Sequence, residues 1–445
     1  MLRRNSKRSP TTKISAARRA AFEILRRVEE SGGYSSFLLA ASAEELQAND
    51  RALTHELVMG VLRRQLWLDY LTAHYGNRKV TSLDAPVRIA LRLGLYQLRF
   101  MSRIPASAAV NESVSLVRFA GLSSAAAFVN AVLRRATREA DFDPLTEISD
   151  PVERLAVESS HPPWLIQRWI DNWGWSEAAA FACANNEVPP TAFRSSGTQD
   201  TVPDSLKGLI TASSIAPGAW RSDGNNASIY ELARQGRIYI QDEASQLVAH
   251  ALQPGSEDLI LDVCAAPGGK TTHLASLSGP SSMVVAGDLH QHRLRSMRSM
   301  SPAESLINIH LVTLDGTRRL PFREQIFDRV LVDAPCTGTG TLRRNPEIRW
   351  RLSPADIEDL AGKQLGILTN AASAVKPGGR LVYSTCSVEP EENEQVVAKF
   401  MNEAGDFRPA KLDVNPELLT SSNTARTWPH RHGADGFFIA AFQRA

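Results

Sequence analysis

Apolar segments that alternate with helical segments fill the C-terminal half of the chain, and this alternation constrains the fold most. Segments of strand length occur at 258–263, 283–288, 308–313, 328–333, 380–385 and 436–443. Helical spacing separates most of them, which predicts a mainly parallel sheet with helices on both faces. Ligands bind such sheets outside the carboxyl ends of the strands, so functional residues are expected directly after the strands.

The first 140 residues have a different pattern, with apolar residues at helical spacing throughout. Beyond a first helix that starts near residue 14, helices are predicted at 35–46, 51–75, 85–100, 107–119 and 123–139. Short segments rich in Gly, Ser or Pro separate them. Six or seven helices joined by short loops predict a compact all-α bundle.

Charge is unevenly distributed between these two parts. The whole chain has a net charge of +2, yet residues 1–140 carry 22 Lys and Arg against 11 Asp and Glu. A basic first third suggests a polyanionic partner. A basic surface that is simply solvated explains the charge equally well.

Four parts are expected along the chain. Residues 1–12 form a basic flexible N-terminus, and 13–142 form the helical domain. Residues 143–235 hold an acidic linker, at about 140–160, and a small α+β segment. Residues 236–445 form the α/β domain, which begins with a short strand that runs into a helix.

The cysteines and the N-terminal segment indicate the cellular compartment of the protein. The four cysteines are scattered without a CxxC pair, which argues against a zinc site or a disulfide framework, and no metal is expected. No apolar run is long enough to span a bilayer, and the N-terminus lacks a secretory signal. Its Arg- and Ser-rich start would suit an organelle transit peptide, but it continues into a helix. We therefore expect a cytoplasmic monomer.

A loop of small residues follows the first strand of the α/β domain, in "LILDVCAAPGGKTTHLA". Such a loop lets backbone N–H groups approach a ligand closely, and the start of the next helix favours an anionic group. Acids follow the next three strands: Asp288, Asp315 and Asp333. The candidate cofactor residues are these three acids and the loop residues Cys264, Ala265, Ala266, Pro267, Gly268, Gly269 and Lys270.

The acids at the strand ends favour one cofactor. Three carboxylates would repel a cofactor rich in phosphate, although an acid can accept hydrogen bonds from ribose hydroxyls. S-adenosylmethionine carries a sulfonium cation, an adenine amine and a ribose, and no phosphate. The pattern therefore favours S-adenosylmethionine over a nicotinamide cofactor.

Two cysteines also follow strands: Cys336 after the fourth strand and Cys386 after the fifth. A lone cysteine is usually a small buried apolar residue. Two cysteines at the edge of the sheet where ligands bind indicate a catalytic role instead. Carbon 5 of a pyrimidine is a poor nucleophile until a thiolate adds to carbon 6, which makes the ring able to attack a methyl group. Asp333 can accept a hydrogen bond from the exocyclic amine of cytosine, which uracil lacks.

Only the thiolate can start this reaction, and the sequence leaves its activation open. The acids Glu389, Glu391 and Glu392, which follow Cys386, oppose ionisation, whereas a helix start near Pro390 and the sulfonium favour it.

Four strings resemble the RNA 5-methylcytosine methyltransferase (RsmB/NOP) family: "DVCAAPGGKT", "DAPCTGTGTLRRNPEIRW", "KPGGRLVYSTCSVEPEENE" and "DGFFIAAF". The resemblance implies a Rossmann-like methyltransferase domain that uses S-adenosylmethionine. It also implies that Cys386 is the nucleophile and that Cys336 assists product release, with Asp333 as a further catalytic residue.

The N-terminal part of the chain indicates which enzymes of this family the chain resembles. "AVNESVSLVRFAG" and "AAAFVNAVLRRA" look like the helical domain of the antitermination factor NusB, and that fusion is the layout of bacterial ribosomal RNA enzymes of the family. It implies methylation of one cytidine in 16S (small-subunit) ribosomal RNA. Two alternatives remain: a transfer-RNA cytosine methyltransferase, or an RNA-binding scaffold with an inactive methyltransferase domain.

Two segments, 343–351 and 191–200, allow more than one interpretation. The Trp and Arg side chains of 343–351 either grip flanking nucleotides or belong to a packed core. At 191–200 the family has an Arg-Val-Asn-type strand, whereas this chain has "TAFRSSGTQD". This departure concerns the detail of the middle segment and not the chemistry.

Overall fold

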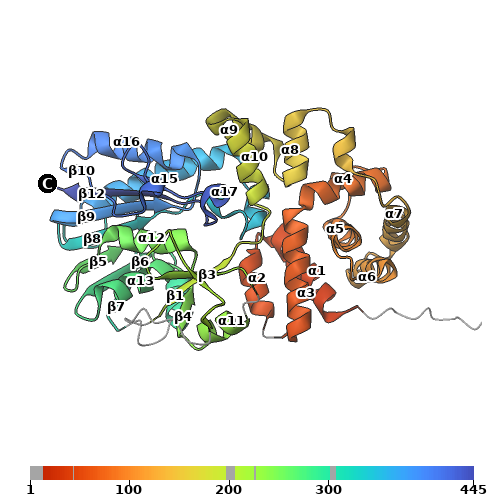
Figure 1. Ribbon diagram of the computed structural model, residues 1–445, viewed down its shortest axis with the longest axis horizontal. Coiled ribbons are helices and arrows are strands. Elements are labelled where there is room, and N and C mark those ends of the chain that lie inside the picture. Colours follow the sequence, from red (N-terminus) through yellow and green to blue (C-terminus); the bar gives the residue numbers. More distant parts are fainter. Residues whose placement is uncertain (1–13, 44, 197–205, 225–226, 301–306) are drawn as a thin grey trace, which may run out of the picture. The chain divides into compact units, whose positions relative to one another are not determined.

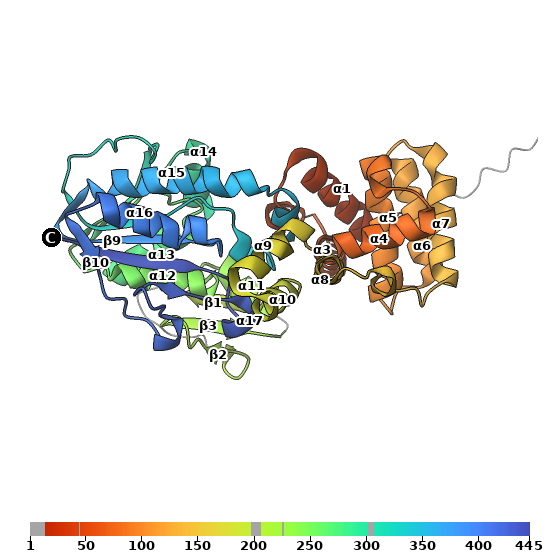
Figure 2. The ribbon, with the colours of Figure 1, turned by 90° about the horizontal axis from the view of Figure 1, so that it is seen from above.

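The computed structural model describes residues 14–43, 45–196, 206–224, 227–300 and 307–445 (Figures 1 and 2). The predicted basic segment 1–12 lies outside these residues. The chain forms two compact units. One, here called the helical unit, comprises 1–187 and 342–351, and the other, the sheet unit, comprises 188–341 and 352–445.

The helical unit contains the predicted bundle. Its first seven α-helices are α1 (Ala16–Ser31), α2 (Ser35–Ser42), α3 (Ala48–Arg63), α4 (Gln65–Gly76), α5 (Ala85–Phe100), α6 (Ala106–Phe119) and α7 (Ala126–Arg138). The helix predicted at 51–75 is in fact two helices, because the backbone leaves the helical region at Arg64 (φ −114°, ψ 16°). No Gly or Pro marks this break, so helical spacing could not reveal it.

The acidic segment predicted to be a linker is mostly helical. It contains a 3₁₀ turn (η3, Pro144–Glu147) and α8 (Pro151–Ser159), and α9 (Pro163–Trp173) and α10 (Trp175–Ala184) follow. The side chain of Asp150 accepts a hydrogen bond from the Glu153 amide at 2.7 Å, with Pro151 in the first turn of α8. The Asp and Pro residues therefore start a helix rather than mark a linker.

Residues 342–351 lie within the helical unit although they are distant from it in sequence. The Arg349 guanidinium is fully buried, and it donates hydrogen bonds to the carbonyl oxygens of Ser159 (3.2 Å) and Ser160 (2.9 Å). The buried Glu347 accepts bonds from the amide and hydroxyl of Ser35, at 2.8 and 2.9 Å. Arg349 is thus part of a packed core, and the hypothesis that it grips RNA is wrong.

A small antiparallel sheet opens the sheet unit, with strand order β2-β3-β1-β4. Its elements are β1 (Thr191–Ser195), β2 (Thr211–Ala212), β3 (Ala219–Ser222), α11 (Ala227–Arg234) and β4 (Ile238–Ile240). The unusual segment "TAFRS" is β1, which pairs with β3 on one side and β4 on the other. Residues 197–200 of that segment lie outside the described residues.

The predicted α/β domain is confirmed as a large, mainly parallel sheet of order β10-β12-β9-β8-β5-β6-β7, with β11 paired to β12. Its strands are β5 (Leu259–Asp262), β6 (Met283–Asp288), β7 (Ile309–Thr313), β8 (Phe327–Asp333), β9 (Val375–Thr385), β10 (Phe407–Pro409), β11 (Ala425–Arg426) and β12 (Phe438–Arg444). Strands β5 to β9 are parallel, and β12 returns antiparallel to β9.

Helices cover both faces of this sheet (Figure 1). One face packs against α12 (Glu243–Leu252) and α13 (Gly269–Ser278), and the other against α15 (Pro354–Ala372) and α16 (Glu394–Glu403). Successive strand residues alternate between the two cores: Ile260 and Leu331 face the first, whereas Leu261 and Val330 face the second. This period of two is expected of strands that are buried on both faces.

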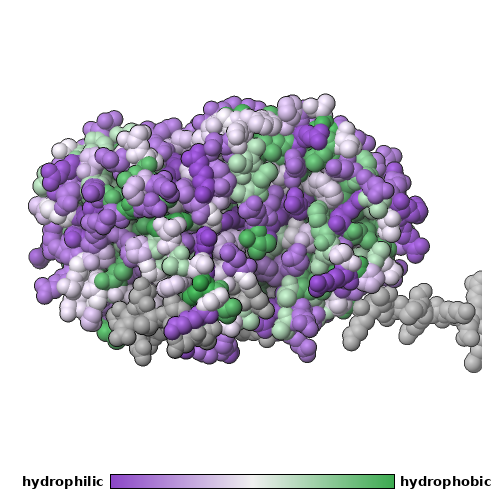
Figure 3. All heavy atoms as spheres, in the orientation of Figure 1, coloured by the Kyte–Doolittle hydropathy of each residue, from purple (hydrophilic) through white to green (hydrophobic). Residues whose placement is uncertain are grey.

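The surface is of mixed polarity, with polar side chains over much of the face shown in Figure 3 and apolar ones between them. Among the described residues, no helix combines the length and the apolar character needed to cross a bilayer.

Candidate active site

The two cysteines predicted to be neighbours lie against each other. Cys336 follows β8 and Cys386 follows β9, and these parallel strands pair in a register that sets Asp333 beside Ser384. The Sγ atoms of the two cysteines are 3.2 Å apart. Parallel strands bring their carboxyl ends to one edge of the sheet, which is why residues fifty positions apart meet.

The structure makes the thiol of Cys336 hard to ionise. The hydrogen bond shared with Cys386 and the burial of the side chain raise the pKa of Cys336 well above its ordinary value. Cys336 therefore stays a thiol, and its S–H can donate to the sulfur of Cys386.

Lys270, which the sequence assigned to the cofactor loop, completes this cluster. Its Nζ lies 2.7 Å from Oδ2 of Asp333, whose Oδ1 accepts a 2.8 Å bond from the Ser384 hydroxyl. Burial disfavours the ammonium, but Asp333 and the Cys386 sulfur outweigh it and raise the pKa of Lys270. Lys270 therefore stays a cation beside Asp333 and close to the sulfur of Cys386. Sequence reasoning did not predict that Lys270 lies beside Asp333 and Cys386.

The cofactor loop turns sharply from β5 into α13. Gly268 has φ +109°, and a Cβ built on it would lie 2.5 Å from Cγ of Met297, so only glycine fits there. The Ala265 amide donates to the Gly287 carbonyl at 2.7 Å, which ties the loop to β6. The loop thereby presents its backbone and the start of α13 at the carboxyl edge of the sheet.

A cavity of about 200 Å³ lies against this loop. Its lining residues are Tyr239, Ile240, Gln241, Ser245, Asp262, Cys264, Ala265, Ala266, Pro267, Gly269, Lys270 and Asp333. It thus joins predicted cofactor residues to Asp333, which the sequence assigned to the reaction. The lining residues from 239–245 and Asp262 were not predicted.

The other two predicted acids are held by local hydrogen bonds. Asp288, which is 5% exposed, accepts from the amides of His290 (2.8 Å) and Ala266 (3.3 Å). Asp315 accepts from the hydroxyl of Thr317 at 2.6 Å and from its amide at 3.0 Å. These bonds lower the pKa of Asp315, the hydroxyl most of all. Both side chains are fixed in place at the ends of β6 and β7.

Asp262, the last residue of β5, is a site residue that sequence reasoning missed. Burial raises its pKa to about 7, although the Thr271 hydroxyl donates to its Oδ2 at 2.7 Å. Its buried Oδ1 has no hydrogen-bond partner. A fourth acid at a strand end was a usable signal, because it directly precedes the loop in "LILDV".

These residues fit S-adenosylmethionine. The acids of the cavity wall suit a cationic ligand with hydroxyl and amine donors, and the unpartnered oxygen of Asp262 is an acceptor still available to one. The loop backbone at the start of α13 suits the carboxylate end of the same molecule.

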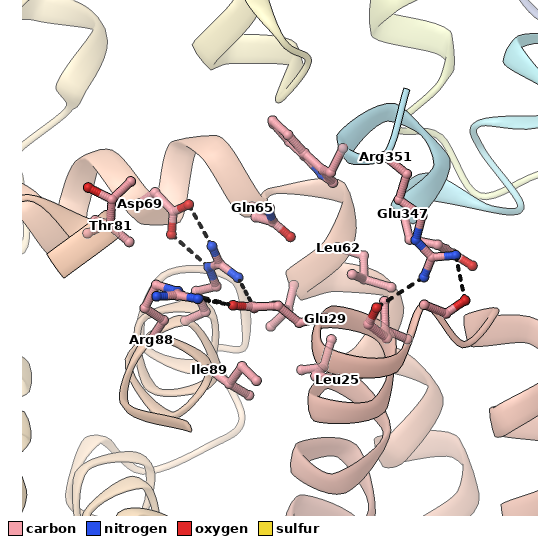
Figure 4. Close-up of a pocket in the computed structure, with 16 residues that line it drawn as sticks. Leu25, Glu29, Leu62, Gln65, Asp69, Thr81, Arg88, Ile89, Glu347 and Arg351 are labelled. Carbon is pink, nitrogen blue, oxygen red and sulfur yellow. Dashed lines mark hydrogen bonds and ion pairs between the residues drawn. The ribbon is translucent and has the colours of Figure 1, made fainter. Parts of the chain in front are cut away.

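A second cavity, of about 530 Å³, lies within the helical unit (Figure 4). Its charged groups already pair with one another: Arg92 bonds Asp69 at 2.7 Å and Glu29 at 2.9 Å. Arg351 donates to the Gly33 carbonyl at 2.7 Å. Because none of the predicted site residues lines it, this cavity is not the candidate active site.

Comparison with known proteins identifies the family of the chain. A family described as 16S rRNA methyltransferase RsmB/F matches residues 249–443, and the NusB family matches 15–138. A probable ribosomal RNA small subunit methyltransferase B of Bacillus subtilis is 35% identical, over 97% of this chain and 99% of that protein. Its counterpart in Synechocystis is 36% identical, over 97% and 100%. The crystal structure of PH0851 has a TM-score of 0.82 at 26% identity, over 96% of this chain and 98% of that one.

The fold and the site define a methyltransferase that uses S-adenosylmethionine and carries a NusB-like helical domain at its front. Within that class, relatives that are more than 30% identical and cover nearly the whole chain identify the family. The chain belongs to the RsmB family.

Proposed function

We propose that this protein methylates carbon 5 of a cytidine in 16S ribosomal RNA through a transient bond between Cys386 and carbon 6 of the base. The 3.2 Å contact between Cys336 and Cys386, with Lys270 of the cofactor loop close enough to interact with Cys386, carries this proposal. The names of the relatives support ribosomal RNA as the substrate. The basic character of residues 1–140 fits an RNA partner.

The reaction begins when the Cys386 thiolate adds to carbon 6, and the electrons of the carbon 5–carbon 6 double bond make carbon 5 nucleophilic. S-adenosylmethionine, when bound, supplies an electrophilic methyl group. Once carbon 5 carries the methyl group, it loses its proton to a base. The electrons of that C–H bond restore the double bond as the bond from carbon 6 to Cys386 breaks.

The remaining residues have supporting roles. Cys336 stays protonated, so its S–H can stabilise the sulfur of Cys386 as it leaves the ring. Asp333 accepts a hydrogen bond from the cytosine amine, and a carboxylate has room for this beside its bonds to Lys270 and Ser384. We assign the ribose hydroxyls of the cofactor to Asp288, and further cofactor contacts to Asp315 and the loop.

Two cysteine variants test the chemistry. Cys386→Ala should abolish methyl transfer to RNA while S-adenosylmethionine still binds, as measured by calorimetry. Cys336→Ala should accumulate a covalent RNA–protein adduct that migrates slowly on a denaturing gel. Cys183→Ala is the matched control, because this cysteine is exposed and lies in the helical unit. Full activity of Cys386→Ala would refute the assigned nucleophile.

Bisulfite sequencing of RNA from a strain without the gene tests the substrate. We expect one unconverted cytidine of 16S ribosomal RNA to become converted. Loss of a signal in transfer RNA instead would favour the first alternative, and no change in either RNA would favour the scaffold. We further propose that the protein acts as a cytoplasmic monomer, which light scattering of the purified protein would check.

A further inference from the structure

The side chain of Glu392 lies buried between the two loops that carry the cysteines. It belongs to a 3₁₀ turn (η8, Pro390–Glu392) after β9 and is 0% exposed. Its Oε1 accepts a 2.9 Å bond from the backbone amide of Thr337, which directly follows Cys336. Its Oε2 accepts bonds from the hydroxyls of Thr337 and of Ser387. One carboxylate therefore holds the residue next to each cysteine.

Neighbouring side chains extend this contact. The Gln364 amide donates to Oε1 of Glu392 at 2.8 Å and to the carbonyl of Pro335, the residue before Cys336, at 2.9 Å. The hydroxyls of Thr337 and Ser387 also lie 3.0 Å apart. All four bonds to the carboxylate come from donors, so its two oxygens are matched by partners on both loops.

A buried carboxylate is costly unless it is this well satisfied. Burial raises the pKa of Glu392, and the hydrogen bonds from Ser387, Thr337 and Gln364 oppose that rise. An apolar side chain would fill the same space without this cost to stability, but it could not orient the two loops. The geometry therefore indicates a role in positioning rather than in packing alone.

We propose that Glu392 is a positioning residue that sets the separation of the Cys336 and Cys386 sulfur atoms, and through it the rate of the covalent reaction. The effect on the reaction rate rests on the proposed function. Glu392 was expected to oppose ionisation of Cys386 as one of three acids after it. In the structure its carboxylate bonds the residues that follow both cysteines.

Catalysis is sensitive to such positioning, because a misplacement of about 1 Å can cost roughly 100-fold in rate. Without the carboxylate, the loop after Cys336 and the loop after Cys386 lose their common acceptor, although the Gly340 amide still donates to the Cys386 carbonyl at 2.9 Å. Among the described residues, the Glu392 carboxylate bonds Thr337, Ser387 and Gln364, and none of these belongs to the cofactor loop or α13. Binding of cofactor and RNA should therefore change little.

The test compares Glu392→Leu, which keeps the volume, with Glu392→Gln, which keeps most hydrogen bonds. In Glu392→Gln the amide oxygen can serve Thr337 and Gln364, while the amide N–H groups face hydroxyls that can accept. Glu403→Gln is the control, because this glutamate is exposed on α16. Ser387→Ala removes a hydrogen-bond donor to Glu392 and keeps the acid. It tests the same contact if Glu392→Leu fails to fold.

Two readouts are needed. Dibromobimane, which fluoresces when it joins two nearby thiols, reports the cysteine pair without RNA or cofactor, and Cys336→Ala gives its background. Steady-state methyl transfer gives kcat and KM. For Glu392→Leu we expect a clear loss of cross-linking and a fall in kcat of about 10- to 100-fold, with KM for RNA within about twofold. Glu392→Gln should recover at least half of the cross-linking, and Ser387→Ala should lose part of it.

The outcomes separate this inference from the proposed function. Wild-type cross-linking in folded Glu392→Leu and in Ser387→Ala would overturn the inference. Loss of cross-linking with unchanged kcat would confirm that Glu392 sets the sulfur separation and would count against the two-cysteine reaction. A rise in KM with wild-type cross-linking and unchanged kcat would also overturn the positioning role.

Discussion

Gly340 offers a sharp test of how closely the two loops that contain Cys336 and Cys386 must pack. It lies in a 3₁₀ turn (η6, Thr339–Thr341) after Cys336, and its amide donates to the Cys386 carbonyl at 2.9 Å. A Cβ at this position would lie 1.9 Å from the carbonyl oxygen of Gly436 and 2.8 Å from that of Cys386. Both obstacles are backbone atoms, which cannot rotate away.

The size of the effect follows from these distances. Real Cβ atoms essentially never come within 3.0 Å of such atoms, so Gly340→Ala must move one loop by about 1 Å. Overpacking of this kind costs about 1–3 kcal/mol of stability. A shift of about 1 Å beside the nucleophile should lower kcat by roughly 100-fold. The fall in kcat should exceed any change in the dissociation constant for S-adenosylmethionine.

The assay is transfer of a labelled methyl group to RNA, with thermal unfolding as the measure of stability. Gly362→Ala is the matched control, because this glycine lies in α15 with nothing within 4 Å of a built Cβ. It should stabilise the protein by about 1 kcal/mol and leave kcat unchanged. Wild-type kcat and stability in Gly340→Ala would refute the argument that the loops are in close contact.

Two further predictions concern buried charges. Because Asp262 has a pKa of about 7 when folded and 3.8 as its ordinary value, it takes up a proton on folding between these pH values. Its contribution to the free energy of unfolding therefore falls by up to about 4 kcal/mol as pH rises from 4 to 7, and urea unfolding of Asp262→Asn should lack this fall. Arg349→Met should destabilise the helical unit by about 3–5 kcal/mol, because it leaves the Ser159 and Ser160 carbonyls without their buried donor. Urea unfolding that matches wild type would contradict the burial of this guanidinium.

The local pattern of the chain was enough to predict much of the site. Apolar segments followed by an acid or a cysteine indicated which residues lie at the carboxyl edge, and Cys336 and Cys386 do meet there. The same pattern failed at 140–160, where Asp and Pro residues start helices. It also failed at Arg64, where two helices meet without a Gly or Pro.

The sequence by itself determined the class of fold and the edge of the sheet that holds the chemistry, because strand ends are set by nearest neighbours along the chain. Only the tertiary structure decided which distant side chains share a hydrogen bond. It placed the ammonium of Lys270 on Asp333 and the carboxylate of Glu392 between Thr337 and Ser387. It also placed 342–351 in the helical unit. Such contacts depend on strand order and on the paths of the loops, and neither is encoded in the spacing of residues within a single segment.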